Sequence, residues 1–289
     1  MNEKVIGVDI GGSHISAAVV DLQHRSIVED SLLRKAINSK ESAEQILNSW
    51  AEVIEQIFLK YPFISKKIGV AMPGPFDYEN GICLIKGVDK YESLFNLNIK
   101  KALAKQLHLA EESMVFMNDA RCFLEGELFG GAAVGCDNVL GITLGTGLGS
   151  ARFHSGQTFE GDLYFAPFKD GVAEDYISSR WFLKKYKEMT GRIAKNVKEL
   201  SEKISEEPEI EKLFEEFGKN LGEILYSYAQ KYNCETLVIG GNIANAWELF
   251  FPETKTILDR LPAVTIKKAM LGEDSALIGA ASLWKRSAS

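Results

Sequence analysis

The sequence predicts a duplicated α/β fold. An apolar run that ends in glycines occurs near the start of each half, at Val5–Ser13 and at Val139–Gly147. Each run opens a set of short β-type segments joined by tight turns, as in a β-meander. Strand and helix patterns then alternate in both halves, which is typical of α/β domains. No linker-like segment separates the halves, so we expect two domains flanking a central cleft, a common place for ligands.

The repeat can be followed residue by residue. Without a gap, the two runs pair Gly7 with Gly141, Asp9 with Thr143, Gly11 with Gly145, and Ser13 with Gly147. Glycine permits positive φ and close backbone approach, so each run predicts a buried strand and a tight turn. Two facing turns rich in backbone N–H groups suit the two ends of a polyphosphate.

Alternation, capping residues and turn residues predict the first half. Strands are expected at Val5–Asp9, Ile15–Asp21, Ser26–Arg34, Lys67–Met72 and Met114–Met117. A helix is expected from Ser42, where Gln45 completes a capping box. Its apolar residues share one face: Ile46, Trp50, Val53, Ile54 and Ile57. Further helices are expected over Asn98–His108 and Arg121–Phe129.

The same signals predict the second half. Strands are expected at Asn138–Leu144, Leu148–Phe153, Thr236–Ile239 and Ala263–Ile266. Helices are expected over Val172–Lys187, Asn196–Ile204, a long segment from Pro208, Ala244–Leu258 and Ser275–Arg286. The stretch Gln157–Gly171 has no periodicity and is expected to be a loop.

Composition excludes some classes of function. The chain of 289 residues carries a net charge of −7, which argues against non-specific binding to nucleic acid or to an anionic membrane. Its four cysteines have no metal-ligand spacing and are expected to be reduced thiols. Asp9 interrupts the first apolar run, and no run is long enough to span a membrane. A cytoplasmic protein is the default expectation.

The glycine turns are candidates for phosphate binding. Gly11, Gly12 and Ser13 would offer N–H groups, and Asp9 would hold Mg²⁺ directly or through water; a plain hairpin turn with a solvated Asp explains this motif equally well. The matching turn is Gly145-Thr146-Gly147. It lacks the third glycine of a dinucleotide fingerprint, and the chain has no P-loop, so a nicotinamide-dependent enzyme is disfavoured.

Other motifs have ordinary explanations when each is taken alone. Asp119, between a short strand and a helix, is best explained as a helix N-cap. Gly74, between two prolines, ends a strand, and Gly240-Gly241 is a strand-to-helix turn. The four histidines have no partners at metal-ligand or catalytic-triad spacing.

Together and in order, these motifs resemble those of the ROK family (repressors, open reading frames and sugar kinases). The resemblance covers essentially the whole chain and implies the actin-like ATPase (ribonuclease H-like) fold. The matching segments are Asp9–Ser13, Val70–Pro75, Asn118–Ala120, Leu144–Gly149, Val238–Asn242 and Leu271–Ala280. Ser13 stands where the family usually has Thr, which keeps the hydroxyl group.

The resemblance implies a role for each motif. Asp119 would be the catalytic base. The phosphate- or ATP-binding residues would be Asp9, Gly11, Gly12, Ser13, Gly145, Thr146, Gly147, Gly240 and Gly241, with Mg²⁺ at Asp9. The sugar-binding residues would be Gly74, Asn118, Asp162 and Glu174. The implied reaction is ATP- and Mg²⁺-dependent phosphorylation of a hexose hydroxyl, such as the 6-OH of glucose or of a related sugar such as N-acetylmannosamine.

One stretch departs from the family. Family members often carry Glu-x-Gly-His, which holds the sugar, followed by a zinc-binding cysteine cluster. Here the stretch reads Asp162-Leu163-Tyr164-Phe165, and no cysteine lies between Cys136 and Cys234, so no zinc site is expected. The identity of the sugar therefore stays open, and a non-catalytic sugar-sensing ROK protein is the alternative.

The expected domains are residues 1–117, with the helix at 275–289 packed back on them, and residues 118–274. The first strand begins close to residue 1, which leaves no room for the DNA-binding domain of the family's repressors. The expected partners are a small sugar and ATP, without nucleic acid or membrane. A homodimer is compatible with the resemblance.

Overall fold

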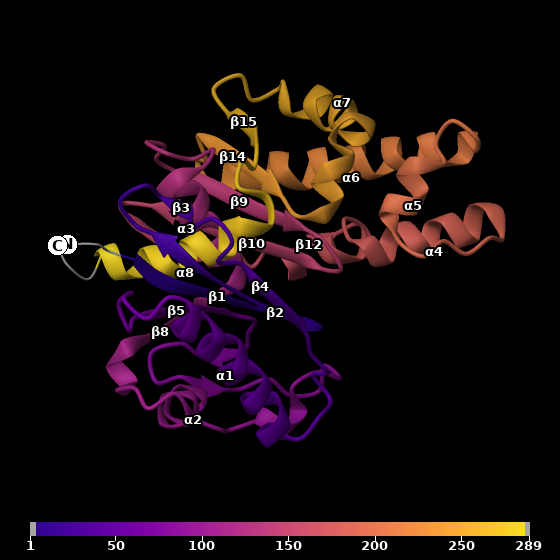
Figure 1. Ribbon diagram of the computed structural model, residues 1–289. Coiled ribbons are helices and arrows are strands. Elements are labelled where there is room, and N and C mark those ends of the chain that lie inside the picture. The colour runs from indigo at the N-terminus through magenta and orange to yellow at the C-terminus, as the bar shows by residue number, and fades with distance from the viewer. Residues whose placement is uncertain (1–3, 287–289) are drawn as a thin grey trace. The chain divides into compact units, whose positions relative to one another are not determined.

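The computed structural model describes residues 4–286 and divides them into two compact units (Figure 1). Unit 1 contains residues up to Val134 together with those from Glu273 onward, and unit 2 contains Gly135–Gly272. The boundary follows helix α3 (Asp119–Gly130), whereas the sequence placed it at residue 117. The reason is that α3 packs along helix α8 (Ser275–Arg286), which belongs to unit 1. Residues 1–3 and 287–289 of the expected first domain lie outside the described residues.

Unit 1 is built on one mixed sheet. Its strands are β1 (Lys4–Ile10), β2 (His14–Asp21), β3 (Ser26–Ile27), β4 (Leu33–Ala36), β5 (Ile68–Met72) and β8 (Met114–Asn118). The order is β3-β2-β1-β5-β8, and β4 also pairs with β2. Strands β1, β5 and β8 are parallel, while β2 is antiparallel to β1. A separate short hairpin joins β6 (Phe76–Asp77) and β7 (Ile82–Cys83).

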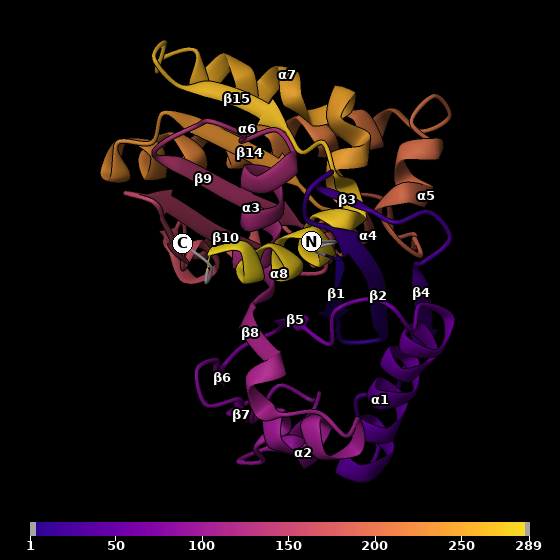
Figure 2. The same cartoon turned by 60° about the vertical axis from the view of Figure 1, so that its left-hand side comes forward.

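Helices pack on this sheet as their sequence patterns predict. Helix α1 (Ala43–Lys60) begins at the Ser42–Gln45 capping box and buries its predicted apolar face. Helix α2 (Ile99–Gln106) has Asn98 as its N-cap. Helix α8 packs on β1 and β5 (Figure 2). A Cβ atom on Gly7 would lie 2.1 Å from the Leu277 carbonyl oxygen. The absence of a side chain at Gly7 therefore allows α8 to pack closely against the sheet.

Unit 2 repeats the same sheet topology. Its strands are β9 (Val139–Leu144), β10 (Leu148–His154), β11 (Gln157–Glu160), β14 (Thr236–Gly240) and β15 (Thr265–Lys268). Their order, β11-β10-β9-β14-β15, matches the order in unit 1. Strand β10 is antiparallel to β9, while β14 and β15 run parallel. The predicted α/β class and its duplication are therefore confirmed, and the aligned residues Gly7 and Gly141 occupy equivalent places, opposite Ala18 and Ala151.

The helices of unit 2 cover a core rich in aromatic residues. They are α4 (Ser179–Thr190), α5 (Val197–Glu202), α6 (Pro208–Tyr232) and α7 (Trp247–Leu258). Phe182, Phe214, Phe217 and Phe250 are fully buried in this core. Their ring centroids lie 4.6–5.4 Å apart in successive pairs, a spacing typical of aromatic clusters. Within residues 4–286, none of the helices is both long enough and apolar enough to cross a bilayer.

Three segments differ from the sequence-based expectation. The stretch Gln157–Gly171 is expected to be a loop, but its first residues form β11, which pairs with β10 through backbone hydrogen bonds that side-chain periodicity does not reveal. The strand expected at Ser26–Arg34 is broken into β3 and β4, because Asp30 turns the chain at φ 56° and the Ser31 side chain bonds to Val19 and Val28. The helix expected from Val172 begins only at Ser179. Before it, β12 (Pro167–Phe168) pairs with β13 (Gly171–Val172), and Ser178 then caps α4 by accepting a hydrogen bond from the Trp181 N–H.

Candidate active site

The first glycine turn of unit 1 joins β1 to β2 directly after Asp9. The Gly11 N–H donates to the His14 carbonyl at 2.9 Å, which closes the turn. The hydroxyl of the buried Tyr91 donates to the Gly11 carbonyl and holds the turn in place. Gly12 and Ser13 remain exposed. Backbone groups in such a turn can bind an anion such as a phosphate.

Asp119 lies at the same edge of the sheet. Parallel pairing puts Asp9 opposite Ala71 on β5, and Ala71 opposite Met117 on β8, two residues before Asp119. Two strand spacings amount to about 10 Å. Both acidic residues thus follow the carboxyl ends of neighbouring parallel strands and lie close to each other within unit 1.

Asn118, not Asp119, caps α3. The Asn118 side-chain oxygen accepts hydrogen bonds from the N–H groups of Ala120 and Arg121, at 3.0 and 3.2 Å. Asp119 is the first helical residue and accepts from the Ala120 N–H at 2.9 Å. The explanation of Asp119 as a simple N-cap is therefore wrong, and its position at the N-terminus of a helix still favours a negative charge there.

Both carboxylates have a raised proton affinity. Burial, followed by the charge of Asp119, raises the pKa of Asp9 to about 7, while Arg34 opposes this shift. Burial also raises the pKa of Asp119, against the backbone hydrogen bond from Ala120 and the charge of Lys90. The surface of the Asp119 side chain is nevertheless open to solvent. It is thus surrounded by protein atoms and still within reach of a small substrate.

This carboxylate pair suits a divalent cation. Mg²⁺ is commonly held by one or two carboxylates together with waters and substrate phosphates, so it does not need a cage of protein ligands. Asp9, half-buried beside a second carboxylate, has the charge that such an ion would neutralise. Among residues 4–286, no group of three or more His, Cys, Asp or Glu side chains has the geometry of a metal cage.

Gly74 and Asn118 are linked through Tyr78. The Asn118 side-chain amide donates to the Tyr78 hydroxyl at 3.3 Å, and that hydroxyl donates to the Met72 carbonyl at 3.1 Å. A Cβ atom on Gly74 would lie 3.1 Å from the Tyr78 oxygen, and the Gly74–Pro75 peptide bond is cis. The structure thus brings these two predicted sugar-binding residues together beside Asp119.

In unit 2, Glu174 supports the second glycine turn. The turn between β9 and β10 is closed by the Gly145 N–H, which donates to the Gly147 carbonyl at 3.0 Å. The Glu174 carboxylate accepts from the Leu148 N–H at 2.8 Å and pairs with Arg180. A Cβ atom on Gly147 would lie 2.5 Å from a Glu174 oxygen. Glu174, predicted to bind sugar, is therefore in contact with the turn that contains Gly145, Thr146 and Gly147.

The third glycine turn lies against the second. Gly241 has φ +87°, and a Cβ atom there would lie 2.5 Å from the backbone nitrogen and oxygen of Leu144. Strand β14, which ends at Gly240, pairs with β9, which ends at Leu144. The two turns therefore leave the same edge of the sheet side by side. This arrangement gathers the predicted nucleotide-binding residues of unit 2.

Asp162 occupies a left-handed turn before a short aromatic stretch. It has φ 56° and an exposed side chain, and the following Leu163 N–H donates to the Ser150 hydroxyl at 2.9 Å. Tyr164 and Phe165 are exposed and stack edge to face, with centroids 4.8 Å apart. Burial, Asp162, Glu160 and Glu174 together raise the pKa of Tyr164. Asp162 thus shares one electrostatic neighbourhood with Tyr164 and Glu174.

A family model supports the resemblance that the motifs indicate. The model described as "ROK family" matches residues 5–167 and 168–287. The chain belongs to the ROK family. A glucokinase from Thermotoga maritima is 25% identical over 98% of this chain and 97% of its own length. An N-acetyl-D-glucosamine kinase from Pectobacterium carotovorum is 22% identical over 96% of this chain and 97% of its own length.

The fold of this ROK protein agrees with that of a solved member. A ROK family glucokinase from Streptomyces griseus, in complex with glucose and AMPPNP, superposes with a TM-score of 0.79 at 24% identity. The match covers 97% of this chain and 98% of that chain. The predicted actin-like ATPase fold is therefore confirmed, as is the ROK family.

The structure adds residues that the motifs did not indicate. The Lys90 side chain lies next to the first turn: a Cβ atom on Gly12 would be 3.9 Å from the Lys90 Cδ atom. The charge of Lys90 also lowers the pKa of Asp119. Lys90 lies in a stretch without periodicity, so the sequence carried no signal for it. Arg180 comes from the first turn of α4 and pairs with Glu174.

Proposed function

We propose that this ROK protein is an ATP- and Mg²⁺-dependent sugar kinase. It transfers the γ-phosphoryl group to a hexose hydroxyl, namely the 6-OH of glucose or of a related sugar such as N-acetylmannosamine. The observation that carries this proposal is Asp119, a reachable carboxylate of raised pKa beside Asp9 and the first glycine turn. The relatives named glucokinase and N-acetyl-D-glucosamine kinase support the reaction class.

Asp119 acts as the general base. It accepts the proton of the sugar hydroxyl as the hydroxyl oxygen attacks the γ-phosphorus. A base is most effective when its pKa approaches the working pH, so the raised pKa of Asp119 suits this step. Asn118 holds the start of α3, and therefore the backbone of Asp119, through its two capping hydrogen bonds. Gly74 and Asn118 contact the sugar.

The phosphate groups need positioning and charge compensation more than covalent chemistry. Backbone N–H groups of Gly12 and Ser13 bind phosphate oxygens in unit 1, and those of Thr146 and Gly147 do so in unit 2. Gly11 and Gly145 close the two turns through their own N–H groups and so shape the phosphate sites. Gly240 and Gly241 contact the nucleotide. Mg²⁺, when bound at Asp9, supplies a Lewis acid that neutralises phosphate charge. Lys90 adds a positive charge close to Gly12 and Asp119.

The direct test is release of ADP with Mg²⁺–ATP and a panel of sugars. The panel contains glucose, mannose, N-acetylglucosamine, N-acetylmannosamine, fructose and allose. We expect turnover on at least one of them. Failure of every sugar, with ATP still bound in calorimetry, would contradict the proposal for these substrates. Family resemblance further leads us to propose a cytoplasmic homodimer that binds no nucleic acid, and light scattering tests the oligomeric state.

A second candidate function is a sugar sensor without catalysis. The observation that favours it is the stretch from Asp162 to Phe165, where the family's sugar-holding Glu and His are absent. Asp162 and Glu174 would then contact sugar without transfer of phosphate. Calorimetry separates the two functions, because a sensor binds sugar with Mg²⁺–ATP present and releases no ADP.

A further inference from the structure

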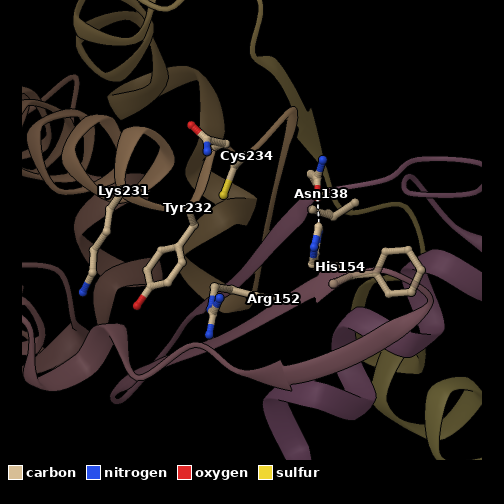
Figure 3. A pocket seen from close by; sticks show the side chains of 9 residues that line it. Asn138, Arg152, His154, Lys231, Tyr232 and Cys234 are labelled. Atoms are coloured by element: carbon tan, nitrogen blue, oxygen red, sulfur yellow. Dashed lines mark hydrogen bonds between the residues drawn. The ribbon is translucent and has the colours of Figure 1, made fainter.

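Unit 2 contains a cavity that the kinase reaction does not use. Its volume is about 390 Å³, and Figure 3 shows the side chains that line it. The lining residues are Asn138, Val139, Arg152, Phe153, His154, Lys231, Tyr232, Asn233 and Cys234. They come from the start of β9, the end of β10 and the segment that leads from α6 into β14.

This cavity is far from the glycine turns. It begins at Val139, the first residue of β9, whereas the phosphate turn follows Leu144, the last residue of that strand. The five steps from Val139 to Leu144 span about 16 Å, at about 3.3 Å per step. The same holds for β14 (Thr236–Gly240), which begins two residues after the cavity residue Cys234 and ends at the third glycine turn. The cavity therefore lies at the N-terminal ends of β9 and β14, and the glycine turns lie at the C-terminal ends of the same strands.

The charge in the cavity is positive. Arg152 and Lys231 line it together with His154, and none of the nine lining residues is a carboxylate. The Arg152 guanidinium lies 3.9 Å from the centroid of the Tyr232 ring, and the Lys231 ammonium lies 4.9 Å from the same centroid. Figure 3 shows the Tyr232 ring and Arg152 next to each other. Two like charges thus share one aromatic ring in a protein of net charge −7.

In the described part of the chain, residues 4–286, no carboxylate compensates these charges, because no ion pair joins Arg152 or Lys231 to one. The partner of Lys231 is the Tyr232 hydroxyl, whose pKa this hydrogen bond lowers. The Arg152 Nε atom is buried and has no hydrogen-bond partner in that same part. Buried polar atoms normally have a partner, and the cost of lacking one is large for charged groups. Burial raises the pKa of Cys234 to about 11, so its thiol stays neutral and supplies no counter-charge.

We propose that this cavity binds the phosphate group of a small phosphorylated ligand. Guanidinium groups bind phosphate oxygens through paired N–H donors, and the unpartnered Arg152 Nε atom is one such donor. Lys231 supplies a second charge, and the Tyr232 hydroxyl and Asn233 side chain supply polar contacts. His154 is held at the rim through its Nδ1 atom and Asn138 Oδ1. The site is independent of phosphoryl transfer.

The test titrates the full-length protein, saturated with AMPPNP and Mg²⁺, with inorganic phosphate and with glucose 6-phosphate by calorimetry. AMPPNP occupies the nucleotide turns, so remaining phosphate binding reports on other sites. We expect one site with a millimolar or lower dissociation constant. Arg152→Gln and Lys231→Gln should each weaken it by about 10-fold or more, because each removes a charge-assisted contact. Lys231 is exposed, so its replacement does not threaten folding.

A matched control is available in the same unit. Arg260 lies over the Tyr226 ring at 4.3 Å but does not line the cavity, so Arg260→Gln should leave phosphate binding unchanged. Binding of glucose 6-phosphate that is tighter than that of phosphate and is weakened by Arg152→Gln would assign a sugar phosphate as ligand, and equal binding would assign the free anion. Absence of binding to the wild type, or equal binding by wild type and Arg152→Gln, would overturn the proposal. Sugar-kinase turnover by the same preparation separates this failure from failure of the proposed function.

Discussion

The two glycine turns have the same scaffold and different chemistry. Each follows the first strand of a sheet with the same strand order, and each has three residues before the next strand. In unit 1 the strand ends near a carboxylate, Asp9, whose pKa is raised to about 7. In unit 2 the aligned residue is Thr143, and a carboxylate from elsewhere, Glu174, is already bound to the backbone and to Arg180.

This difference indicates how a duplicated fold divides its tasks. Within the described residues, no ion pair joins Asp9 or Asp119 to a basic side chain. Arg34 and Lys90 only lower their pKa values through charge, so the two carboxylates keep the capacity to bind a metal ion or a proton. Glu174 in unit 2 is committed to holding the turn around Gly147. We therefore expect substitutions in unit 1 to change catalysis and protonation, and substitutions in unit 2 to change the shape of the nucleotide site.

The largest effect is expected for Asp119→Asn. It keeps the size of the side chain and removes the base, so turnover should fall by about 10²–10⁴-fold while sugar binding persists. Steady-state kinetics and sugar calorimetry measure the two quantities. Because the pKa of Asp119 is raised, the wild-type rate should fall with decreasing pH from a point above the ordinary Asp value. Near-normal turnover of the variant would remove Asp119 from its assigned role.

A steric test addresses the turns of unit 2. Gly241→Ala places a methyl group about 2.5 Å from the Leu144 backbone at φ +87°, so we expect a loss of about 2–4 kcal/mol of folding free energy and weaker binding of ATP. Gly156→Ala is the control. Its φ is +79° and its Cβ would meet no atom within 4 Å, so only backbone strain, about 1 kcal/mol, remains. Equal losses in urea unfolding would contradict close packing of the two turns.

The protonation of Asp9 should appear in stability measured without Mg²⁺. The pKa of Asp9 is about 7 in the folded protein and has its ordinary value of 3.8 in the unfolded chain, so the unfolded chain loses this proton first as the pH rises. The resulting stabilisation is full below about pH 4 and is lost as the pH rises to 7. Asp9→Asn lacks this loss and should be more stable than wild type at pH 8, by about 1–3 kcal/mol after allowance for partial exposure. Thr143→Val, at the aligned position, keeps Asp9 and should therefore keep the pH dependence of the wild type in urea unfolding.

A smaller effect is expected for Lys90→Met. It removes a positive charge beside Gly12, so turnover should fall by about 3- to 30-fold. The same change raises the pKa of Asp119 further, which should move the acidic limb of the pH–rate profile upward. Lys86→Met is the control, because Lys86 is exposed and lies over the Phe95 ring. A profile identical to that of wild type would exclude an electrostatic role for Lys90.

Particular residues show how far the sequence could be interpreted. The Ser42 capping box, the α1 stripe and the match of Gly7 with Gly141 follow local rules of spacing, and the structure confirms them. The prediction of a helix from Val172 was wrong. The first residues form the hairpin of β12 and β13, and Ser178 caps the helix that begins at Ser179, although the sequence has helical periodicity from Val172 onward. The break between β3 and β4 depends on Asp30 adopting a positive φ, which its residue type permits without requiring it.

The amino-acid sequence alone determined the α/β class, the duplication and the family, because these depend on periodicity, glycine turns and motif order along the chain. Only the tertiary structure showed that Asn118 takes the cap and leaves Asp119 at the helix start, and that Glu174 is bound to the turn at Gly147. It alone brought Lys90 to Gly12 and collected Arg152, Lys231 and Tyr232 around one cavity. The burial and the charge environment of a side chain depend on which distant segments pack against it, and the spacing of residues along one chain does not reveal those long-range contacts.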